Sequence, residues 1–112
     1  MEQVERLQQY LQILSDINRL RIIKFIGNDE RTVSEIVNAM NLSQPLVSHH
    51  LKTLKNSSIL DTKRVGPFIF YTLKDARFLD LLGLFEEILP KEGMPEVTPM
   101  FCCPNWWKKF NC

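Results

Sequence analysis

NLSQPLVSHHLKTL, residues 41–54, is the stretch of the sequence with the clearest structural pattern. Ser43 is a favourable helix N-cap, and Pro45 falls in the first helical turn, where its missing N–H removes no hydrogen bond. Apolar residues at helical spacing predict the buried face of this helix: Val47, Leu51 and Leu54. Polar residues are left on the outer face: Ser48, His49, Lys52, Lys55 and Asn56.

Three more helices are predicted before this stretch, over residues 2–15, 17–27 and 32–41. The first carries an apolar stripe made of Val4, Leu7, Leu11 and Leu14. Asp16 is expected to cap the second helix, and Thr32 with Glu35 forms a capping box at the start of the third. Residues 28–31 are polar and are predicted to form a turn.

The pattern after residue 59 changes to that of extended chain. Residues 60–65 and 68–73 predict two strands joined by a Gly66-Pro67 turn, which is a β-hairpin. A fifth helix, capped by Asp75, is predicted over residues 76–89 and ends at Pro90. The predicted fold is mainly α with a β-hairpin, in the order α-α-α-α-β-β-α of a winged helix-turn-helix domain. Residues 1–90 are assigned to this domain, and residues 91–112 to an irregular tail that contains the cysteines.

The net charge of +1 hides an uneven distribution of charged residues. Residues 1–43 carry five Lys/Arg and six Asp/Glu, and residues 78–112 carry three and five. Residues 44–77 carry six Lys/Arg and only two Asp/Glu, a balance of +4. A local basic region, rather than the total charge, attracts phosphates.

Several classes of protein are disfavoured by the composition. No apolar run reaches the ~20 residues that cross a bilayer, and the polar N-terminus does not resemble a secretory signal. We therefore expect a cytoplasmic protein without a membrane partner. An enzyme is not expected, because both histidines lie on the helix of residues 44–56 and no set of nucleophile and base is evident.

Two short helices joined by a tight turn and followed by a basic hairpin predict binding to double-stranded DNA. Ser48, His49 and Lys52 are placed to reach base edges in a major groove. The helix start, with Ser43, Gln44 and Pro45, suits a phosphate contact. Lys63 and Arg64 of the hairpin suit phosphate or minor-groove contacts.

Two alternatives apply to the same helix. Its outer face is also compatible with an ordinary solvated surface. A metal site formed by His49 and His50 is disfavoured, because adjacent helical residues point about 100° apart. His50 is instead expected to pack beside Val47 and Leu54 or to cap a local hydrogen bond.

Residues 16–74 resemble the ArsR/SmtB family of bacterial and archaeal repressors. The resemblance rests on DINRLRII (residues 16–23), on LSQPLVSHHLKTL (residues 42–54) and on Tyr71 of the hairpin. It implies a homodimer built from the first and last helices, and repression that is relieved by a ligand, often a metal ion or metalloid. The apolar residues expected at that interface lie in these two helices: Val4, Leu7, Leu11, Leu14, Phe78, Leu82 and Phe85.

The family's usual metal ligands are missing from two places. Metal-sensing members often have Cys-Val-Cys at the start of the third helix, where this chain has Thr32-Val33-Ser34, and the fifth helix contains no histidine. Three cysteines remain, Cys102, Cys103 and Cys112. Three thiolates suit a soft centre such as As(III) or Sb(III), so the expected function is a repressor released by such an effector.

Alternatives to a metalloid sensor stay open. Cys112 is able to form a redox-sensitive disulfide with Cys102 or Cys103, or the cysteines are incidental to function. A winged-helix module that binds a protein and no metal is a further possibility, because fold does not fix function. Salt-dependent DNA binding distinguishes that module from a repressor.

Overall fold

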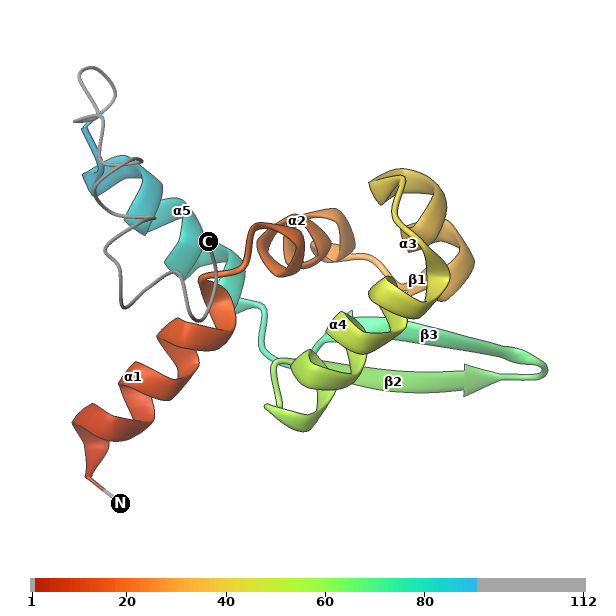
Figure 1. Cartoon of the computed structure of the whole chain (residues 1–112), viewed down its shortest axis with the longest axis horizontal. Helices are drawn as coiled ribbons and strands as arrows, with labels where there is room; N and C mark the ends of the chain where they lie inside the picture. Colours follow the sequence, from red (N-terminus) through yellow and green to blue (C-terminus); the bar gives the residue numbers. More distant parts are fainter. Residues whose placement is uncertain (1, 91–112) are drawn as a thin grey trace, which may run out of the picture. The chain divides into compact units, whose positions relative to one another are not determined.

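The computed structural model describes residues 2–90, whose elements are labelled in Figure 1. They run in the order α1 (Gln3–Leu14), α2 (Ile17–Ile26), β1 (Arg31–Thr32), α3 (Val33–Met40), α4 (Gln44–Asn56), β2 (Leu60–Val65), β3 (Phe68–Leu73) and α5 (Arg77–Ile88). Residues 2–82 belong to one compact unit, and residues 83–90, which include the end of α5, belong to another. The predicted winged helix-turn-helix order is confirmed, with one short strand added.

Helices α2, α3 and α4 begin where side chains satisfy free amides of their first turns. Asp16 accepts hydrogen bonds from the backbone amides of Asn18 and Arg19, at 2.8 and 3.2 Å, and so caps α2. Thr32 and Glu35 form the predicted capping box of α3, with the Glu35 amide donating to the Thr32 hydroxyl at 3.2 Å. Ser43 caps α4 by accepting from the Leu46 amide at 3.4 Å. These three caps confirm the helix starts read from the sequence.

The hairpin pairs β2 with β3 in an antiparallel register in which Val65 faces Phe68 and Leu60 faces Leu73. Gly66 has a φ of 60°, a conformation that glycine adopts without the steric cost other residues meet. The prediction of a two-stranded sheet with a turn over residues 28–31 is wrong for Arg31, because β1 adds a third strand through pairs with Tyr71 and Phe70. A strand of two residues has no detectable alternation, so only its pairing reveals it.

The core of residues 2–82 is built mainly from aliphatic side chains. Nine of them are essentially inaccessible to solvent: Ile22, Ile23, Ile26, Ile36, Val47, Leu51, Leu54, Ile59 and Leu60. The predicted inner face of α4 is therefore confirmed, and it packs against residues from α2, α3 and β2. No helix among residues 2–90 combines the length and the apolar character that a membrane span requires.

The capping box gives the first testable expectation. Thr32→Ala removes the hydroxyl that accepts from the Glu35 amide, and loss of such a cap costs about 1 kcal/mol of stability. We expect the free energy of unfolding, measured by urea titration at fixed protein concentration, to fall by about that amount. Thr32→Ser keeps a hydroxyl and should stay close to the wild type. Equal losses in both variants would show that the methyl group, and not the cap, matters.

Candidate nucleic-acid interface

The outer face of α4 is the first part of the candidate interface. All six residues predicted there to contact DNA are exposed: Ser43, Gln44, Pro45, Ser48, His49 and Lys52. The helix contains no acidic residue, and Lys52 and Lys55 give it a positive charge. Its opposite face is buried in the core, so the outer side chains are presented on a rigid support.

The start of α4 lies at the exposed end of a tight turn. Asn41 caps the end of α3 in the left-handed conformation, with a φ of 56°, and only Leu42 separates it from Ser43, the N-cap of α4. Asn tolerates this conformation better than most residues, which makes the tight turn possible. The positive end of the helix dipole lies at the exposed residues Ser43 and Gln44, an arrangement suited to a phosphate group.

The hairpin, called the wing from here on, carries the other two predicted contact residues. Lys63 and Arg64 are both exposed. The Lys63 ammonium lies 3.4 Å from the Glu30 carboxylate, and Arg64 Nε donates to the carbonyl of Gly66 at 3.4 Å. Exposed ion pairs of this kind are weak, so Lys63 is readily available to a phosphate.

His50 lies on the buried side of α4, away from its outer face, and is only 4% exposed. Arg19 Nε donates to His50 Nδ1 at 3.2 Å, and an Arg19 terminal nitrogen donates to the Ile13 carbonyl at 3.3 Å. Burial lowers the pKa of His50; Asp16 opposes this shift, while Arg19 and His49 add to it. Sequence reasoning placed His50 correctly beside the core but missed Arg19, because no local pattern links residues that lie so far apart in the chain.

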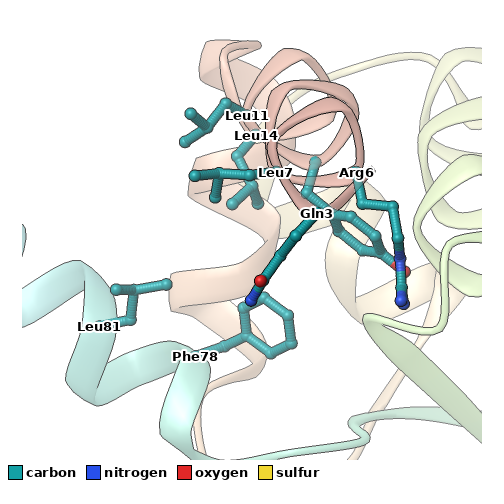
Figure 2. Close-up of a pocket in the computed structure, with 8 residues that line it drawn as sticks. Gln3, Arg6, Leu7, Leu11, Leu14, Phe78 and Leu81 are labelled. Carbon is teal, nitrogen blue, oxygen red and sulfur yellow. The ribbon is translucent and has the colours of Figure 1, made fainter. Parts of the chain in front are cut away.

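A second surface involves the apolar residues predicted at a dimer interface. A groove of about 460 Å³ is lined by Gln3, Arg6, Leu7, Tyr10, Leu11, Leu14, Phe78 and Leu81. Figure 2 shows three leucines of α1 along one wall, with Phe78 and Leu81 of α5 on the other.

The predicted interface residues differ in burial. Val4, Leu7 and Leu11 are 72%, 58% and 52% exposed, whereas Leu14 is buried in the core. Phe78 and Leu82 are partly buried against that core. Phe85, in the second unit, is 55% exposed. An exposed apolar stripe on one helix, such as Val4, Leu7 and Leu11 of α1, commonly marks a contact with another protein surface.

The predicted metal ligands Cys102, Cys103 and Cys112 lie outside the described residues. Among residues 2–90, no group of three His, Cys, Asp or Glu side chains is arranged to hold a metal ion. Thr32 and Ser34 occupy positions where the resembling family often has cysteines, and Thr32 serves there as the helix cap.

Comparison with known proteins agrees with this geometry. Residues 16–62 match the family described as bacterial regulatory protein, arsR family. The arsenical resistance operon repressor of Staphylococcus aureus is 31% identical over 78 residues, which cover 70% of this chain and 75% of that protein. The chain belongs to the ArsR family. Since the matched family consists of regulatory proteins, the expectation that the chain is not an enzyme is confirmed.

Another relative of this ArsR-family chain is the cadmium resistance transcriptional regulatory protein CadC of Listeria innocua. It is 36% identical over 76 residues, 67% of this chain, and the chain spans 64% of CadC's length. Among solved structures, NolR from Sinorhizobium fredii has a TM-score of 0.70 at 27% identity, covering 76% of this chain and 85% of that one. A homodimeric winged helix-turn-helix domain from Mycobacterium bovis has a TM-score of 0.69 at 21% identity, covering 76% and 79%, and supports the fold.

The lowered pKa of His50 predicts how stability depends on pH. When the pH is below about 6.5, the ordinary pKa of histidine, His50 of the unfolded chain binds a proton. His50 of the folded protein binds that proton less readily, because its pKa is lower. The free energy of unfolding should therefore fall as the pH is lowered from 7.5 to 5, and this fall should be smaller in His50→Gln. Urea titrations across that range measure it, and His49→Gln is the matched control on the exposed face. An identical pH slope in His50→Gln and wild type would contradict the assignment.

Proposed function

We propose that the chain is a homodimeric transcriptional repressor that binds operator DNA through α4 and the wing. The observation that carries the proposal is the two-sided character of α4. Its inner face is fixed in the core, and its acid-free outer face presents Gln44, Ser48, His49 and Lys52 to solvent. A helix of this kind fits the major groove of B-DNA, which is about 12 Å wide.

Each part of the interface has a distinct role in the proposal. Base edges are contacted by Ser48, His49 and Lys52. Phosphate is contacted by the start of α4, which consists of Ser43, Gln44 and Pro45. Lys63 and Arg64 contact the backbone or the minor groove beside it. Phosphate contacts supply much of the affinity, and base contacts supply the choice of sequence.

A homodimer is the second element of the proposal. The exposed stripe of α1 and the groove beside Phe78 and Leu81 offer an apolar surface that a second copy is able to cover. The Mycobacterium bovis domain of the same fold is a homodimer, which supports this arrangement. A two-fold dimer presents two copies of α4 to two half-sites, so the operator should be an inverted repeat.

We further propose that As(III), or another soft metal ion, releases the protein from DNA by binding Cys102, Cys103 and Cys112. Thiolates are the preferred ligands of soft ions, and three of them match the valence of As(III). The names of the relatives, one tied to arsenical and one to cadmium resistance, support an effector of this class. Release requires that the effector bind the low-affinity arrangement of the dimer more tightly than the DNA-bound one. Such a regulator would act in the cytoplasm.

DNA binding is tested with duplexes selected from a random-sequence pool by the full chain. We expect an inverted repeat, and an affinity that falls steeply as salt rises from about 50 to 200 mM, because phosphate contacts release counterions. Arg64→Gln should weaken binding and lower the slope of log affinity against log salt by about one. Arg21→Gln, which removes an exposed charge from α2, is the control and should leave the slope unchanged. Failure to select any duplex would favour a protein-binding module.

The effector is tested by adding arsenite to the reduced, DNA-bound protein without oxygen. We expect one As(III) per chain, protection of three thiols, and release of the DNA. The variant with Cys102, Cys103 and Cys112 all replaced by serine should bind the duplex and remain bound when arsenite is added. Release of this variant by arsenite would reject the cysteine site. Release of the wild type by a mild oxidant, but not by arsenite, would favour the redox switch.

A further inference from the structure

The tip of the wing is apolar, although its base is charged. Val65, Phe68 and Ile69, on either side of the Gly66-Pro67 turn, are 50%, 57% and 45% exposed. Turn tips are ordinarily polar, because their side chains face water. Exposed apolar side chains that lie together in this way commonly mark a surface that contacts a partner.

The geometry of the wing explains why the fold itself does not cover this patch. β1 pairs only with Tyr71 and Phe70, so the part of the hairpin beyond them has two strands and no third neighbour. In Figure 1 the turn of the hairpin lies beyond the neighbouring helices α3 and α4. Val65 and Phe68 form the last pair before the turn and share one face, while Arg64 and Ile69 form the preceding pair on the other.

The charges around the tip indicate the chemistry of its partner. Lys63 and Arg64 directly precede Val65, and no acidic residue lies between Asp61 and the end of β3. Arg64 Nε also donates to the Gly66 carbonyl at 3.4 Å, which keeps its guanidinium beside the turn. An apolar turn with the Arg64 guanidinium beside it matches a surface that offers both flat base faces and phosphates, which is what a nucleic acid presents.

We propose that Phe68, with Pro67 beside it, is an apolar wedge that enters the minor groove of the bound duplex and partly unstacks one base step. Arg64 contacts the phosphates flanking that step. Aromatic and proline side chains serve as such wedges in minor grooves, where they kink the duplex. The wedge would favour flexible pyrimidine–purine steps, and so would read the operator outside the base pairs that α4 contacts. This inference rests on the proposed function, because it requires that the chain bind duplex DNA.

The test compares two substitutions at the same turn. Phe68→Ser removes the proposed wedge, and Ile69→Ser removes an apolar side chain of similar exposure from the other face of the hairpin. With the selected duplex, Phe68→Ser should weaken binding by about tenfold or more, because base–aromatic contacts are lost. It should leave the salt slope unchanged, since no phosphate contact is removed. Ile69→Ser should have a clearly smaller effect. Both residues are exposed, and thermal unfolding checks that both variants fold.

A direct readout of unstacking completes the test. The fluorescent base 2-aminopurine is placed in turn at each position flanking the inverted repeat, and its emission rises when its neighbours unstack. We expect a rise at one flanking step with the wild type and no rise with Phe68→Ser. The wedge would be overturned if the wild type bound without any rise in 2-aminopurine emission and if wild type and Phe68→Ser bound the duplex with equal affinity. The repressor proposal would still stand. A change in sedimentation of Phe68→Ser with unchanged DNA affinity would also overturn the wedge, and would assign the tip to contact between copies. No salt-dependent binding by the wild type would overturn both proposals.

Discussion

Burial of one side of α4 is the constraint on which the rest of the structure depends. Val47, Leu51 and Leu54 are fully buried among residues of α2, α3 and β2. With 3.6 residues per turn, fixing these positions also fixes the direction of Ser48 and Lys52 on the other side of the helix. The outer residues need no contacts of their own to be held in place. Truncating one of the buried leucines to alanine would cost about 2–5 kcal/mol and would loosen the whole surface.

Two polar contacts join this helix to α1. The Tyr10 hydroxyl donates to the Ser57 carbonyl at 2.7 Å, just beyond the end of α4. Arg19 connects the Ile13 carbonyl, near the end of α1, to His50 on the buried side of α4. Helix α1 also carries the apolar stripe of the proposed dimer interface. These hydrogen bonds give a physical connection between the arrangement of a dimer and the position of the proposed DNA-binding helix.

The sequence predicted the local features of this fold well, because each arises from residues a few positions apart. The caps at Asp16, Thr32 and Ser43, the turn at Gly66-Pro67 and the inner face of α4 all belong to this class. Features made by distant residues were missed: β1, the Arg19–His50 hydrogen bond and the exposure of Phe68. An alternating or apolar strand pattern predicts burial, but only the absence of a neighbouring element shows that the wing tip is uncovered.

The sequence by itself determined the order of the elements, the faces of the helices and the basic character of residues 44–77. These properties follow from local hydrogen bonding and from the spacing of apolar side chains, so no knowledge of the packing is needed. Only the tertiary structure decided which apolar residues are covered. Leu14 is buried while Leu7 and Leu11 on the same stripe stay exposed, and Val65 and Phe68 project beyond the core. Burial depends on which surfaces from distant parts of the chain meet, and that is a property of the assembled fold.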